Sequence, residues 1–134
     1  MNYKRMAVAA AAAFVAAMAY EIAVFGLLLQ DLHRPHYGSL LVPEGEINNG
    51  AMFGWTLVGA VAISFFYAQF AKGRNPGWVN GALFGACLGM VAAVVPQAYN
   101  GIFLKAWPFF PHWALAGFAE QVFLGIVLGL TYRE

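Results

Sequence analysis

The stretch WVNGALFGACLGMVAAVV, residues 78–95, decides the fold class, because it contains no charged residue and is almost long enough to cross a bilayer as a helix. A helix needs about 20 mainly apolar residues to cross the roughly 30 Å of bilayer hydrocarbon. Three further stretches of the chain are comparably apolar and long. The sequence therefore predicts an all-α integral membrane protein with four transmembrane helices, at residues 6–29, 50–71, 78–103 and 112–132.

The composition indicates the same class. Hydrophobic residues make up 62% of the 134 residues and charged residues 10%, whereas soluble domains average roughly 45–50% and 25%. So few polar side chains cannot cover a water-facing surface, which excludes a water-soluble globular enzyme and a disordered chain. The net charge of +1 provides no field for binding nucleic acid. We expect one transmembrane domain, residues 1–134, with the lipid bilayer as its surroundings.

Basic residues predict the orientation of the spans. Five of the seven lie at the two chain ends and in the loop 72–77, and only Arg34 and Lys105 lie on the opposite side. Because basic segments stay in the cytoplasm, both termini are predicted to be cytoplasmic, with an outer loop at 30–49. Short connections favour an up-down-up-down bundle of sequential neighbours. Aromatic residues at the predicted span ends are expected interfacial anchors: Trp78, Trp107, Trp113 and Tyr132.

Glycines at four-residue spacing predict where helices contact each other. Lipid does not drive apolar helices together, so transmembrane helices associate where small residues let their backbones approach. The helix-packing glycines predicted in the third and fourth spans are Gly81, Gly85, Gly89, Gly125 and Gly129. The second span begins with a similar pair, Gly50 and Gly54. Packing within the chain is the first interpretation, and a seam between two copies is the alternative.

Two carboxyl groups fall inside predicted spans, Glu21 in the first and Glu120 in the fourth. A charge at mid-membrane costs at least about 2.5–3.5 kcal/mol on insertion scales, so such groups are paired, protonated or functional. The two glutamates could meet and share a proton. A structural lock between helices, a polar pocket for a small ligand or protons, and a metal site all stay open. The other candidate pocket residues are the outer polar side chains Gln97, Asn100, Asn48, Asn49 and Gln121.

The metal hypothesis depends on three histidines on the predicted outer side: His33, His36 and His112. With Glu44, Glu46 or Glu120 they could complete a shell of nitrogen and oxygen ligands. Their spacing matches no known metal motif, and exposed interfacial histidines are the simpler interpretation. No cofactor is predicted, although a metal or a pigment stays open. Only His112 is placed on a span, where a haem or chlorophyll ligand would lie.

A set of sequence features, spread over most of the chain, carries a resemblance to a known family. They are the alanine-rich first span ending in Tyr20 and Phe25-Gly26, Gly50 and Gly54, FFYAQF at 65–70, Gly81-Ala82-x-x-Gly85, Pro96 with Asn100 and Phe103, Trp107, and Gly125-x-x-x-Gly129. In these features the chain resembles the small four-span bacterial membrane proteins catalogued as domain of unknown function seventeen-sixty-one. The resemblance implies a four-span fold in the bacterial cytoplasmic (inner) membrane. It implies no established chemistry.

The sequence contains no pattern typical of a catalytic site, since a Gly-rich phosphate loop, GxSxG and HExxH are all missing. The leading hypothesis is a small non-catalytic inner-membrane bundle that binds a partner or a lipid, as a homo-oligomer or as an accessory subunit of a larger membrane complex. The alternative is a carrier or membrane enzyme. It would use Glu21 and Glu120 in an outward-facing polar pocket for a proton, a small ligand or a metal.

Overall fold

The computed structural model describes residues 2–32, 46, 48–100 and 109–132, and of residues 95–100 and 109–110 it describes the backbone alone. All regular secondary structure in these residues is helical, so the prediction of an all-helical chain is confirmed for this part. The elements are α1 (Tyr3–Tyr20), the π-helix η1 (Glu21–Leu28), α3 (Asn49–Phe70), α4 (Trp78–Asn100) and α5 (Phe109–Thr131).

The helices lie at the four predicted spans, with small shifts at their ends. For example, α5 begins at Phe109 rather than at 112. Within the described residues, three helical stretches are long and apolar enough to cross a membrane: Tyr3–Leu28, Asn49–Phe70 and Pro111–Thr131. The stretch Trp78–Val94 of α4 is apolar but shorter. The described length of α4 is 23 residues, because the helix continues to Asn100.

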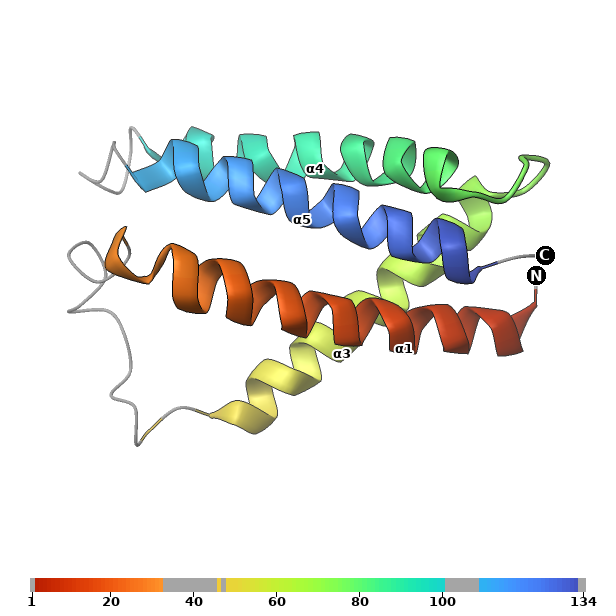
Figure 1. Cartoon of the computed structure of the whole chain (residues 1–134), viewed down its shortest axis with the longest axis horizontal. Helices are drawn as coiled ribbons and strands as arrows, with labels where there is room; N and C mark the ends of the chain where they lie inside the picture. The colour runs from red at the N-terminus through yellow and green to blue at the C-terminus, as the bar shows by residue number, and fades with distance from the viewer. Residues whose placement is uncertain (1, 33–45, 47, 101–108, 133–134) are drawn as a thin grey trace.

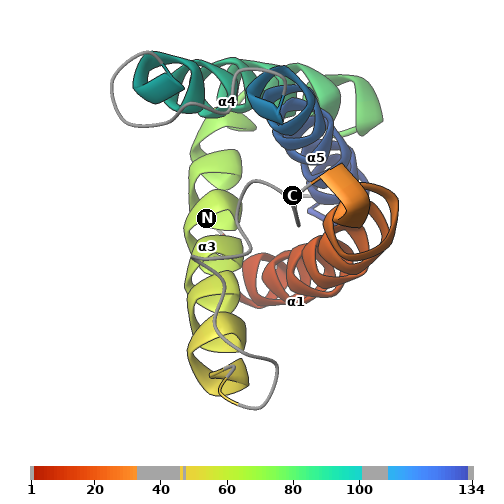
Figure 2. The same cartoon turned by 90° about the vertical axis from the view of Figure 1, so that its left-hand side faces the viewer.

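Successive helices run in opposite directions, and both described ends of the chain lie at the same end of the molecule (Figure 1). In space, α1 packs between α3 and α5, and α5 packs along α4. Figure 2 shows this open arrangement from the end where α5 begins. The expectation that sequential helices pack as neighbours is therefore wrong for α3 and α4, which touch only slightly. Instead, α3 crosses the molecule obliquely and packs mainly on α1.

The contact between α4 and α5 is made through glycine. A methyl group added at Gly81 would overlap the backbone of Gly125, and one added at Gly129 would overlap the backbone of Gly77. At Gly89 an added methyl carbon would lie 2.9 Å from Cδ2 of Phe118. The two helices approach this closely because a hydrogen stands where any other residue has a side chain. Since this face of α4 is covered by α5, it is not available to α3.

The glycine pair at the start of α3, Gly50 and Gly54, does not lie in a close helix contact of this kind. Outside the backbone of α3 and the adjacent residues, no described atom lies within 4 Å of a methyl group added at Gly54, and at Gly50 the nearest such atom belongs to the neighbouring Asn48. Packing of this pair within the chain is therefore wrong for the described residues, and a seam between two copies stays a prediction. The contact of α3 with α1 involves alanines, of which Ala13 and Ala60 belong to the same buried cluster.

Aromatic rings close the core near the chain termini. Tyr67 of α3 is fully buried, and its ring meets Phe84 of α4 edge-on at a centroid distance of 5.2 Å. It also meets Tyr132 edge-on at 6.1 Å. Tyr132 is therefore buried in the core, whereas Trp78 and Trp113 are exposed, and the role of these side chains as interfacial anchors stays a prediction. Trp107 lies outside the described residues.

Local interactions begin and end the helices. The side chain of Asn2 accepts a hydrogen bond from the backbone of Arg5 at 3.2 Å. The side chain of Asn48 accepts one from the backbone of Ala51 at 2.9 Å. Such caps satisfy amide groups that the first helical turn leaves unpaired. The turn between α3 and α4 contains Gly73 at a φ of 71°, a left-handed conformation that favours glycine.

Candidate functional site

The two carboxyl groups predicted inside the spans, Glu21 and Glu120, line the same space between the helices. Glu21 is the first residue of η1, and Glu120 lies in the middle of α5. Both line a cavity of about 430 Å³, here called the central pocket. Both also line a second cavity of about 580 Å³, here called the end pocket. The structure thus places both carboxyl groups in the lining that the two pockets share.

The central pocket is bounded by α1, α3, α4 and α5, and its wall is mostly apolar. Its lining includes Ala17 from α1, Phe66 from α3 and Leu88 from α4. Besides the carboxyl groups, the polar side chains among the described lining residues are Thr56 and Gln121. The Thr56 hydroxyl donates a hydrogen bond to its own helix, to the carbonyl of Met52 at 3.0 Å. The pocket therefore offers few hydrogen-bonding groups away from the carboxyl pair.

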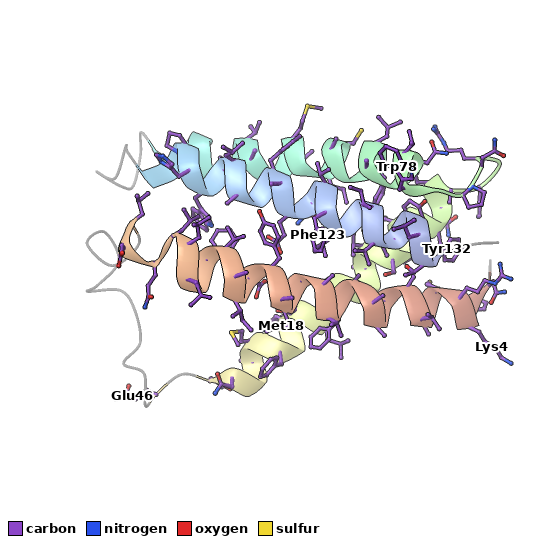
Figure 3. All side chains as sticks on the ribbon, in the orientation of Figure 1. Lys4, Met18, Glu46, Trp78, Phe123 and Tyr132 are labelled. Carbon is purple, nitrogen blue, oxygen red and sulfur yellow. The ribbon has the colours of Figure 1, made fainter. Side chains whose placement is uncertain are left out.

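The end pocket lies between the end of α1, η1, the first turn of α3 and the first half of α5, on the side of the molecule away from the chain termini. Aromatic rings of Phe25 and Trp113 and the thioethers of Met18 and Met52 form much of its wall. In Figure 3, Met18 projects from α1 on the side that faces α3. Among the described lining residues, the charged groups of this pocket are again Glu21 and Glu120.

A tyrosine next to the carboxyl pair ties α1 to α5. The hydroxyl of Tyr20 donates a hydrogen bond to the carbonyl oxygen of Ala116 at 2.8 Å. Its ring stacks on Phe123 of α5, with centroids 6.0 Å apart, and Phe123 lies between the two helices (Figure 3). Because Tyr20 precedes Glu21 and Ala116 lies one helical turn before Glu120, this contact holds the two carboxyl groups near each other. Sequence analysis missed this role, since a tyrosine in a span gives no sign of its partner.

The helix changes its winding at the carboxyl group. From Glu21 to Leu28 it is a π-helix, in which the hydrogen bonds join residues five apart. One such bond is donated by the backbone of Leu29 to the carbonyl of Val24 at 2.8 Å. Short π-helical turns occur often at functional sites, because the extra residue redirects side chains. The apolar pattern of this segment predicted a single continuous span, and nothing in that pattern indicates the change.

Of the other predicted pocket residues, the structure places some at the pockets and others away from them. Gln121 lines the central pocket together with the carboxyl pair. Asn48 and Asn49 are exposed at the start of α3 and line neither pocket. Gln97 and Asn100 belong to α4, but their side chains lie outside the described part of the structure.

The candidate metal ligands are scattered or not described. His33, His36 and Glu44 lie outside the described residues. His112 is exposed at the start of α5 and lines neither pocket. Among residues 2–32, 46, 48–100 and 109–132, no group of three His, Cys, Asp or Glu side chains is close enough to hold a metal ion.

Comparison with known proteins adds no relative to these observations. No protein-family model, no curated protein and no solved structure matches the chain.

Proposed function

We propose that this chain is an integral membrane protein that crosses the bacterial cytoplasmic membrane four times. Three long apolar helices support this, and α4 is long enough to be the fourth span. The first turn of α1, which contains Lys4 and Arg5, and the turn between α3 and α4, which contains Lys72 and Arg74, lie at the same end of the molecule as the chain termini (Figure 1). By the positive-inside rule this end is cytoplasmic, so the end pocket faces the outer side.

We further propose that the carboxyl pair is a binding site for one positive charge, and that the protein acts as a small binding protein or carrier. The observation that carries this proposal is that Glu21 and Glu120 line both pockets. Two ionised carboxylates cannot stand uncompensated between apolar walls within a bilayer. The pair therefore holds a proton when the pockets are empty and exchanges it for the cationic group of a ligand.

The experiment is infrared spectroscopy of the purified protein, which detects the carbonyl stretch of a protonated carboxyl group. We expect the wild-type protein to show this band at neutral pH, because the pair retains a proton. The double variant Glu21→Gln/Glu120→Gln should lack the band, since glutamine keeps the size and hydrogen bonding of the protonated acid. Glu46→Gln is the matched control, because Glu46 is exposed and lines neither pocket.

Two outcomes would contradict the proposal. One is a wild-type spectrum without a protonated carboxyl band at neutral pH, because the pair would then hold no proton. The other is a band that persists unchanged in the double variant, because its source would then lie elsewhere. Circular dichroism and gel filtration of each variant show whether the fold is retained.

A second candidate function is that of an accessory subunit of a larger membrane complex or of a homo-oligomer. The observation in its favour is the first half of α3, where Phe53, Trp55 and Val58 are exposed. Purification in native lipid, with mass spectrometry of the proteins and lipids that remain bound, tests it. A partner recovered in a constant ratio would support this function, and a chain that purifies alone as a monomer would count against it.

A further inference from the structure

We infer that the ligand of the two pockets is an amphiphilic organic cation, an amine or ammonium ion that carries an aromatic or aliphatic body. This inference rests on the proposed function, since it names the class of ligand that the carboxyl pair takes. The pair supplies the charge complement, and the apolar walls on both sides of it supply the surface for the body.

The charges of the site select against anions. Both pockets are lined by Glu21 and Glu120, and no Lys, Arg or His is among the described residues that line them. An anion would lie beside carboxylates with no positive group to compensate it, at a cost that rises in an apolar setting. A monovalent cation placed between the two carboxyl groups instead takes the place of the proton and compensates one of the two negative charges.

The size and wall chemistry select against a bare metal ion. Volumes of about 430 and 580 Å³ lie in the range of pockets that hold organic molecules. Hard metal ions need a shell of six or more oxygen ligands, or water in their place. Apart from the carboxyl groups, the central pocket offers Thr56 and Gln121, and the end pocket offers mainly rings and thioethers. These walls suit the carbon skeleton of an organic ligand.

The end pocket adds two features suited to an organic cation. Rings such as those of Phe25 and Trp113 attract ammonium groups through their negative faces. Met18 and Met52 have flexible, polarisable side chains that adapt to ligands of different shape. We therefore expect recognition of a class of compounds rather than of one molecule. The ammonium group would lie at the carboxyl pair, with apolar substituents in one or both pockets.

Ligand binding is coupled to proton release in this arrangement. The proton held by the carboxyl pair leaves to water as the cation enters, and the atoms and charges balance as a one-for-one exchange. The titratable groups at the site are Glu21 on η1, Glu120 on α5 and Tyr20 on α1, while the described lining residues of α3 and α4 contain none. Affinity for the cation should therefore rise with pH wherever the empty pair retains its proton.

The experiment compares two probes of nearly equal shape and opposite charge, tetraphenylphosphonium and tetraphenylborate, on the full-length protein in detergent. A smaller cation with one ring, benzyltrimethylammonium, is measured beside them. Binding is followed by equilibrium dialysis, and partition into detergent is subtracted with the Glu21→Gln/Glu120→Gln variant. We expect both cations to bind, the anion not to bind, and a pH dye to report about one proton released per cation.

The variants separate charge recognition from wall contacts. Glu120→Gln should weaken cation binding by at least about tenfold, because it removes one member of a buried charge contact. Trp113→Ala should weaken it about 2- to 30-fold, the range expected for a cation–ring contact. Trp55→Ala and Glu46→Gln are the matched controls, because both side chains are exposed and line neither pocket.

The outcomes distinguish the two proposals. If the protonated carboxyl band is present but neither cation binds more tightly than tetraphenylborate, the amphiphilic-cation inference is overturned and the proton site stands. Equal cation binding by the wild-type protein and by folded Glu120→Gln would overturn it as well. If the band itself is missing, the proposed function fails independently of any probe.

Discussion

Replacing Gly85 with alanine tests the close glycine contact between α4 and α5. An added methyl carbon at Gly85 would overlap the carbonyl oxygen of Gln121 and would lie 2.7 Å from the Cα atom of Val122. Both atoms belong to the backbone of α5, so no change of side-chain rotamer can relieve the overlap. The helices would have to separate.

The size of the effect follows from this geometry. Ordinary contacts of a methyl carbon begin at 3.4 Å, so the Cα atom of Val122 alone would require α4 and α5 to move apart by about 0.7 Å, and the overlap with the Gln121 oxygen requires more. Overpacking of this kind costs about 1–3 kcal/mol. Alanine also favours a helix over glycine by about 1 kcal/mol, which works in the opposite direction. The overlap is therefore best measured against a glycine in the same chain that has open space.

Gly54 is that control, because it lies inside α3 and its added methyl carbon would meet no described atom within 4 Å beyond its own helix. The free energy of unfolding of each variant can be measured by titrating detergent-solubilised protein with dodecyl sulfate and following tryptophan fluorescence. We expect Gly54→Ala to be as stable as the wild-type protein or slightly more stable. Gly85→Ala should be about 1–3 kcal/mol less stable than Gly54→Ala, and Gly85→Leu should lose the folded form.

Equal stability of the two alanine variants would refute the reasoning. It would mean that α4 and α5 do not approach at Gly85, and that the glycine row faces lipid or another copy of the chain.

Three further predictions concern orientation and two tyrosines. In a cysteine-free background, a cysteine at Ser39 should react with an impermeant reagent from the outside and one at Asn75 only from the inside; the reverse labelling pattern would contradict cytoplasmic termini. Tyr20→Phe should lower the free energy of unfolding by about 1 kcal/mol, because the hydrogen bond to Ala116 is lost while the ring remains; a variant as stable as the wild-type protein would show that this bond contributes nothing. Tyr67→Phe should leave stability unchanged or raise it by about 1 kcal/mol, because its buried hydroxyl has no hydrogen-bond partner among the described residues. A clear loss of stability in the same unfolding titration would reveal a partner for that hydroxyl.

The sequence by itself determined the helical class of this protein and the approximate position of each helix. Long uncharged stretches can satisfy their backbone groups only within themselves when water is excluded, so composition and length are sufficient to predict such helices. It also singled out Glu21 and Glu120, because a carboxyl group inside an apolar stretch is costly wherever the helix lies.

Only the tertiary structure decided which helices are neighbours. Glycine rows occur in several spans, and their spacing does not say which row meets which. Gly85 lies against α5, whereas Gly54, in a similar pattern, lies in open space. The choice depends on how two whole surfaces fit. For the same reason α3 packs mainly on α1 and barely touches α4, although the short connection between α3 and α4 predicted that they would be neighbours.

The candidate site was likewise completed only in three dimensions. Glu21 and Glu120 are separated by most of the chain, and their common pockets arise because Tyr20 joins α1 to α5 beside them. The π-helical turn that starts at Glu21 depends on packing, because an apolar sequence is compatible with either winding. Asn48 and Asn49 share the polar character expected of pocket residues, yet they line neither pocket, since polarity alone does not determine the direction in which a helix end points.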